Sequence, residues 1–165
     1  FSQAVKRGVD VRLRTIERAS SPDQSLAKEL IEDLGVAERV EWLSPGLSTG
    51  YTWRELSGLY RAADIVADEF GGSWFGLVSL EGATCGIPVL NSLDLDAMGV
   101  AYPDGWPFVE VEDEKAVCDA IAMLADSEKR MSIGSASRQW ILEHHDRDVV
   151  TRRCESMLAD LGIPD

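Results

Sequence analysis

Apolar runs and helical apolar stripes alternate along the chain. Strand-like runs occupy residues 9–16, 40–43, 65–67 and 87–90, and a last one falls within 106–111. Apolar residues at i, i+3 and i+4 predict helices over 22–34, 53–62 and 75–85, and three more between about 113 and 162. Residues 1–7 resemble the end of a helix, and 91–107 are expected to be irregular. This alternation predicts an α/β fold with a parallel sheet.

The stretch from Asp64 to Leu90 organises this pattern. It predicts a strand, a glycine-bearing loop, one helix from about Phe75 to Cys85 that is closed by Gly86, and a second strand. The loop follows the carboxyl end of a strand, where open α/β sheets bind their ligands.

The start of that helix is suited to an anion. Its first backbone N–H groups have no partner within the helix and carry the positive end of the helix dipole. Gly76 has no side chain, so an anion can approach the amides of Gly76, Leu77 and Val78. Glu81 lies about 7.5 Å further along the axis, and its carboxylate can accept hydrogen bonds from two neighbouring hydroxyls. A buried strand–helix–strand element with a surface glutamate fits the same residues.

Residues 73–89 resemble the Glu-x7-Glu signature region of glycosyltransferase family 4. The match rests on Phe75-Gly76-Leu77, on Glu81, and on the run Cys85-Gly86-Ile87-Pro88-Val89. The resemblance implies a Rossmann-like three-layer α/β/α sandwich, namely the C-terminal, donor-binding half of a two-domain GT-B enzyme. Residues 1–165 would form one nucleotide-sugar-binding domain with its C-terminal helices at about 113–162.

The resemblance also implies roles for single residues. Glu81 matches the family's second glutamate, which typically holds the nucleotide ribose. The first glutamate, typically near the transferred sugar, falls on Ser73, so no catalytic residue carries over. The donor-sugar region would comprise Ser73, Trp74, Phe75 and Glu69, and Asp68 is a further acid that could take the place of the missing glutamate. Paired carboxylates suit acid/base chemistry, but the sequence does not fix the separation of Glu69 and Glu81.

The function implied by the resemblance is transfer of a sugar, with retention, from a UDP- or GDP-sugar to an acceptor hydroxyl. It requires no metal and no cofactor beyond the nucleotide-sugar substrate. The partner would be an N-terminal acceptor-binding domain or a separate chain. Two alternatives stay open: a non-catalytic interaction module that descends from such an enzyme, and a GT-B sugar-nucleotide epimerase.

Donor domains of that family begin with a strand that is followed by an arginine and a lysine. This chain is expected to start after that strand, and Lys6 and Arg7 do not match the basic pair. The first residue is Phe1 rather than methionine, which suggests a fragment or a processed chain. The sheet would therefore lack its first strand, and these 165 residues alone are expected not to transfer sugar.

The amino-acid composition limits the classes of binding partner. Sixteen basic and 29 acidic residues give a net charge of −13, which argues against nucleic acid and anionic lipid. The sequence contains no apolar run of transmembrane length. Three widely spaced cysteines without metal-ligand spacing favour a location in the reducing cytoplasm. Any peripheral contact with a membrane would be made through other parts of the protein. Residues 144–146, His-His-Asp, are expected to end a helix rather than to bind a metal.

Overall fold

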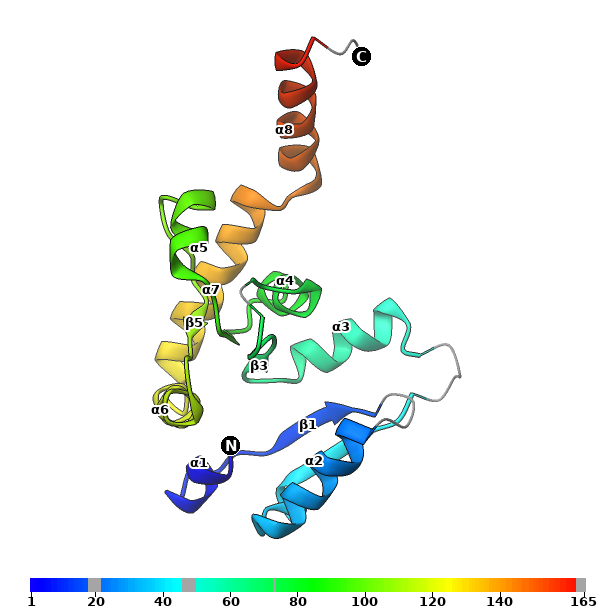
Figure 1. The fold of residues 1–165 in the computed structure, drawn as a ribbon, viewed down its shortest axis with the longest axis vertical. Coiled ribbons are helices and arrows are strands. Elements are labelled where there is room, and N and C mark those ends of the chain that lie inside the picture. The colour runs from blue at the N-terminus through cyan, green and yellow to red at the C-terminus, as the bar shows by residue number, and fades with distance from the viewer. Residues whose placement is uncertain (18–21, 46–49, 73, 163–165) are drawn as a thin grey trace.

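The computed structural model describes residues 1–17, 22–45, 50–72 and 74–162. Strands and helices alternate as expected (Figure 1). The elements are α1 Ser2–Lys6, β1 Leu13–Ile16, α2 Pro22–Asp33, the 3-10 helix η1 Ala37–Arg39, β2 Val40–Leu43, α3 Trp53–Arg61, β3 Val66–Ala67, α4 Leu77–Thr84, β4 Val89–Asn91, α5 Leu95–Ala101, β5 Val109–Glu110, α6 Glu114–Met123, α7 Ser127–His144 and α8 Arg147–Asp160.

The described strands form two parallel sheets. β1 pairs with β2, in register from Leu13↔Val40 to Ile16↔Leu43. The second sheet has the order β3-β4-β5, and all its pairs are parallel. The sequence predicts one sheet that lacks its first strand, and among the described residues the strands form two sheets, with β1 and β3 each at an edge.

Helices cover both faces of the three-stranded sheet. Strand residues alternate between the faces, so Val66 and Val89 lie in one core cluster and Leu90 in the other. The first cluster joins the strands to α4, α5 and α7 through Ala83, Met98, Trp140 and Ile141. The second joins them to α1 and α6 through Ala4, Cys118, Ile121 and Leu124. The domain is therefore an α/β/α sandwich.

Most helix starts carry a side-chain cap, which satisfies amides that have no partner within the helix. The capping residues are Thr52, Asp94, Asp113, Asp126 and Asp146, before α3, α5, α6, α7 and α8. The cap at Asp94 marks a helix within 91–107, so the expectation that this stretch is irregular is wrong in part. The N-cap of α4 is Gly76, which has no side chain to supply a hydrogen bond.

The histidine pair lies where two helices meet. α7 ends at His144, and Asp146 caps α8, which projects away from the rest of the domain (Figure 1). Within the described part of the chain, no group of three or more His, Cys, Asp or Glu side chains is placed to hold a metal ion. No helix in these ranges is both long and apolar enough to cross a membrane.

Candidate functional site

The start of α4 lies beside the carboxyl end of β3, and a carboxylate of the protein itself occupies it. Asp68 directly follows β3. Its Oδ2 atom accepts hydrogen bonds from the backbone N–H of Gly76 at 3.2 Å, from the backbone N–H of Ser79 at 2.9 Å and from the Ser79 hydroxyl at 2.6 Å. Asp68 thus supplies the cap that Gly76 cannot, and its negative charge faces the positive end of the helix dipole.

This contact explains why position 76 is a glycine. The φ angle of Gly76 is −92°, which any residue can adopt. A Cβ atom at this position would lie 2.9 Å from Asp68 Oδ2, too close for the hydrogen bonds to survive unchanged. Gly76 therefore permits the close approach of the Asp68 carboxylate.

A buried polar network continues from Asp68 into the sheet. The Ser79 hydroxyl, which donates to Asp68, accepts a hydrogen bond from Asn91 Nδ2 at 2.9 Å. Ser79 and Asn91 are both completely buried. The network links the end of β3, the first turn of α4 and the end of β4, so the helix start is fixed relative to both strands.

Glu81 has one partner, Tyr60 on α3. The Tyr60 hydroxyl donates to Glu81 Oε2 at 2.6 Å. Burial, with the Glu81 carboxylate beside the ring hydroxyl, raises the pKa of Tyr60 well above its usual value, so the hydroxyl stays protonated as a donor. Glu81 is partly exposed, and its Oε1 atom accepts no hydrogen bond from the described residues. No sequence pattern links these two residues, which lie 21 positions apart.

Close backbone packing fixes the helix that carries Glu81. A Cβ at Gly82 would lie 2.9 Å from Val66 Cγ2, so α4 lies directly against β3. After α4 the chain turns through Gly86, whose carbonyl oxygen would be 2.0 Å from a Cβ at Gly134 on α7. Glycine at both contacts lets α4 pack tightly between β3 and α7.

The predicted donor-sugar residues separate in the structure. Phe75 is buried at the centre of an aromatic cluster with Phe108, Tyr102 and Trp140, at ring-centroid distances of 5.4, 6.0 and 5.8 Å. Trp74 stacks on Phe75 at 5.1 Å and is 39% exposed. The rings fix the backbone just before α4 and leave Trp74 at the surface. Ser73 lies outside the described residues.

The remaining predicted residues are solvent-facing. Leu77 is exposed and Val78 is half-buried, so the first turn of α4 borders the surface. Glu69 is exposed, and its carboxylate forms no hydrogen bond with the described part of the chain. Its backbone carbonyl accepts from the Ser92 N–H at 3.0 Å, which ties the loop after β3 to the end of β4.

The histidines belong to the aromatic cluster rather than to the start of α4. Tyr102 and His145 are hydrogen-bonded, with 3.1 Å between the hydroxyl oxygen and Nε2. Burial lowers the pKa of His145, and the nearby His144 and Arg153 lower it further. A neutral ring packed against Trp140, with a centroid distance of 4.8 Å, fits this environment.

Comparison with known proteins relates the chain to glycosyltransferases. No profile of a known protein family matches it. It is 33% identical over 147 residues to the D-inositol 3-phosphate glycosyltransferase of Corynebacterium aurimucosum, covering 82% of this chain and 32% of that protein. The enzyme of the same name from Mycobacteroides abscessus is 44% identical over 63 residues, 38% of this chain and 13% of that one. The chain thus spans about a third or less of these relatives.

Solved structures share the fold. Anabaena HepE, crystallised in complex with UDP-glucose, matches 96% of this chain and 44% of its own, with a TM-score of 0.71 and 20% identity. The sucrose-phosphate synthase of Thermosynechococcus elongatus matches 97% of this chain and 41% of its own, with a TM-score of 0.70 and 19% identity. The predicted Rossmann-like α/β fold of GT-B type is therefore confirmed.

Proposed function

We propose that this chain is the donor-binding part of a retaining glycosyltransferase that takes a UDP- or GDP-sugar. The observation that carries the proposal is the placement of Glu81 on α4, with one carboxylate oxygen held by Tyr60 and the other open. Support comes from the glycosyltransferase relatives and from the UDP-glucose bound by a protein of the same fold.

In this proposal Glu81 binds the ribose. Tyr60 orients the carboxylate through Oε2, so Oε1 is directed to the nucleotide and accepts from a ribose hydroxyl. Tyr60 is thus a positioning residue. A carboxylate acceptor forms a stronger hydrogen bond than a neutral acceptor does.

The diphosphate would lie against the exposed first turn of α4, at the amides of Leu77 and Val78. Asp68 already accepts from the flanking amides of Gly76 and Ser79. Its negative charge beside a diphosphate must be balanced by cations from outside this helix, since like charges in one site repel. The loop with Ser73, Trp74, Phe75 and Glu69 would border the sugar, and no metal or other cofactor is required.

Transfer itself requires an acceptor site, which we assign to an N-terminal domain or a partner chain. Holding two reactants together lowers a barrier by roughly 7–11 kcal/mol, so the 165 residues alone should bind donor without turnover. We place the protein in the cytoplasm, with any membrane contact made elsewhere in the polypeptide.

Asp68 at the helix start, together with Ser73, favours a second candidate, a non-catalytic module of the same fold.

The test is calorimetric titration of the chain with UDP and GDP. Glu81→Gln keeps the shape and removes the charge, and should weaken binding about 10- to 150-fold, the equivalent of about 1.5–3 kcal/mol. Tyr60→Phe should weaken it by a smaller factor. Glu155→Gln, on exposed α8, is the matched control and should bind as the unmodified chain does. No nucleotide binding by the unmodified chain favours the non-catalytic module, and unchanged affinity of Glu81→Gln removes Glu81 from the site.

A further inference from the structure

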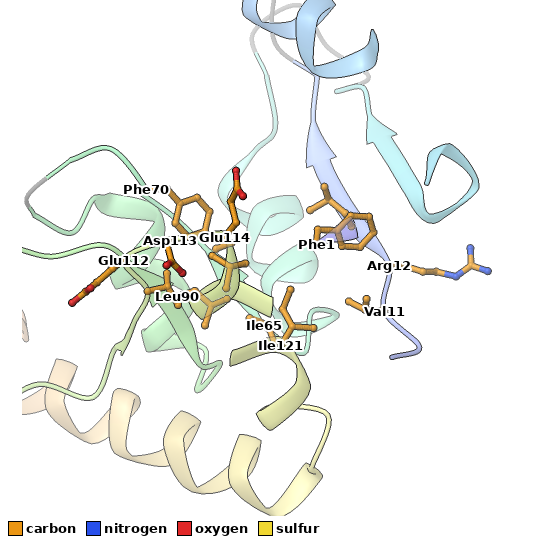
Figure 2. Close-up of a pocket in the computed structure, with 14 residues that line it drawn as sticks. Phe1, Val11, Arg12, Ile65, Phe70, Leu90, Glu112, Asp113, Glu114 and Ile121 are labelled. Atoms are coloured by element: carbon orange, nitrogen blue, oxygen red, sulfur yellow. The ribbon is translucent and has the colours of Figure 1, made fainter. Parts of the chain in front are cut away.

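Trp74 is an exposed aromatic residue on the loop that leads into α4. It directly precedes Phe75 and the N-cap Gly76, so its backbone lies close to the first turn of the helix. The loop has a second exposed aromatic residue, Phe70, but that side chain lines a groove between β1 and the three-stranded sheet (Figure 2). Trp74 is not part of that lining. Of these two rings, Trp74 is the one that a ligand at the start of α4 can meet.

The Trp74 ring is held by its neighbours and open on one face. It stacks on the buried Phe75 ring, with 5.1 Å between centroids and an interplanar angle of 28°. Tyr102 lies at 6.2 Å and is tilted by 33°. Because Phe75 covers one face and 39% of Trp74 stays exposed, the indole presents its other face to solvent. A ligand that packs on a ring already held in this way loses little affinity to side-chain ordering.

The indole N–H of Trp74 adds a directional contact. In Trp140, the buried tryptophan of the aromatic cluster, the N–H donates to the Gly105 carbonyl oxygen at 3.1 Å. The Trp74 N–H donates to no acceptor among the described residues. A tryptophan that serves packing alone satisfies its donor within the protein, whereas Trp74 keeps both a ring face and a donor for a ligand.

A sugar ring fits this combination. The C–H groups of a pyranose form an apolar face, and its hydroxyls surround that face at the edge of the ring. An aromatic ring packs on the apolar face, while the N–H at the rim of the indole reaches a hydroxyl. Ligand sites commonly combine aromatic surface with a few polar groups of this kind. Trp74 thus has the chemistry to hold the transferred sugar.

The charges around the loop select against a sugar that carries a carboxylate. Residues 64–84 contain four acidic residues and no lysine, arginine or histidine. Two of these acids belong to the loop, where Asp68 is held at the helix start and the Glu69 carboxylate folds back onto the same loop. Arg138 contacts this segment only at the Thr84 carbonyl oxygen, at the other end of α4. A sugar carboxylate would therefore meet like charges, which weaken binding.

We propose that Trp74 is the stacking residue for the transferred sugar and that this sugar is an uncharged hexopyranose. The inference rests on the proposed donor-binding function and names the class of sugar for it. Trp74 packs on one face of the sugar and donates to one hydroxyl, while the first turn of α4 holds the diphosphate. The nucleotide therefore binds without help from Trp74, whereas the contribution of the sugar to affinity depends on it.

Calorimetric titration of the full chain compares UDP with UDP-glucose, UDP-galactose and UDP-N-acetylglucosamine, or GDP with GDP-mannose if the chain binds GDP more tightly than UDP. Trp74→Ala should weaken binding of the tightest neutral donor about five- to thirtyfold and that of the free nucleotide by at most about twofold. Trp74→Phe keeps a ring without the N–H and should lose less. The matched control is Trp53→Ala, at another exposed tryptophan, and should leave the ratio of donor to nucleotide affinity unchanged.

An NMR measurement follows Trp74 directly in the unmodified chain. The chain contains five tryptophans, and the indole N–H signal that Trp74→Phe removes identifies that of Trp74. This signal should shift when the sugar nucleotide is added and should move little with the free nucleotide. The Trp140 signal, from an N–H that already donates to Gly105, should stay in place with both.

The possible failures are distinguishable. Equal losses for donor and nucleotide in Trp74→Ala, with an unshifted Trp74 indole signal, would overturn the role of Trp74 and leave the donor-binding function standing. UDP-glucuronate that binds as tightly as the neutral donors would overturn the class of sugar. Absence of nucleotide and donor binding by the unmodified chain would overturn both this inference and the proposed function.

Discussion

Replacing Asp68 with alanine should destabilise the domain more than any other surface carboxylate change. The substitution removes three hydrogen bonds to one charged oxygen, two of them from the first turn of α4. Hydrogen bonds to charged groups contribute about 1.5–3 kcal/mol each, but those that share one acceptor are not additive. Because Asp68 is only half-buried, water can replace part of the loss. We expect a loss of about 3 kcal/mol, and about half of that for Asp68→Asn, which keeps one acceptor.

Urea unfolding followed by tryptophan fluorescence measures the loss of stability in Asp68→Ala, since the chain contains five tryptophans. With a denaturant slope of about 2 kcal/mol/M, the midpoint should fall by about 1.5 M. Asp104→Ala, at an exposed position without a described partner, should stay within about 0.5 kcal/mol of the unmodified chain. Sulfate should stabilise Asp68→Ala more than the unmodified chain, because it can occupy the vacated helix start. A midpoint for Asp68→Ala equal to that of Asp104→Ala would refute the capping role.

Two further predictions concern packing and pH. Gly134→Ala should destabilise the domain by about 3 kcal/mol in the same assay, because its Cβ would clash with the Gly86 carbonyl. The control Gly58→Ala, in a helix with open space around it, should instead stabilise the domain by about 0.5–1 kcal/mol. Equal changes in stability for the two variants would contradict the close contact between Gly134 and Gly86. The pKa of His145 is lowered in the folded state, so the unfolded chain binds a proton at this residue more readily. The contribution of neutral His145 to stability is therefore fully present above about pH 6.5 and should decline as the pH falls through that value. His145→Gln should flatten this decline between about pH 7.5 and 5.5, and an unchanged pH profile would count against it.

The sequence predicts the alternation of elements well, because apolar periodicity directly reflects burial. It does not predict α5, because Gly99 and the prolines after it are typical of irregular structure, and the capping residue Asp94 is the only signal of a helix there. It identifies Asp68 as an acid near the site but not as the cap of α4, because the turn through Gly71 and Gly72 leaves the direction of the side chain open.

Glu81 illustrates the same limit. The pattern places it on the helix after the glycine loop, but its partner Tyr60 comes from another helix, and periodicity carries no information on such pairs. The glycosyltransferase fold is confirmed by comparison. The binding roles of Gly76, Leu77, Val78 and Glu81 remain predictions, and the titration of Glu81→Gln tests that of Glu81.

The split sheet has a consequence for how the domain opens. No residue of β1, α2 or β2 is fully buried, whereas most of the described core lies on the side of the three-stranded sheet. Local opening requires least free energy where few apolar contacts are lost, so the β1–α2–β2 unit can unfold while the rest persists. Trp42 in β2 and Trp140 in α7 would then report separate transitions. A single melting temperature would then not describe the molecule.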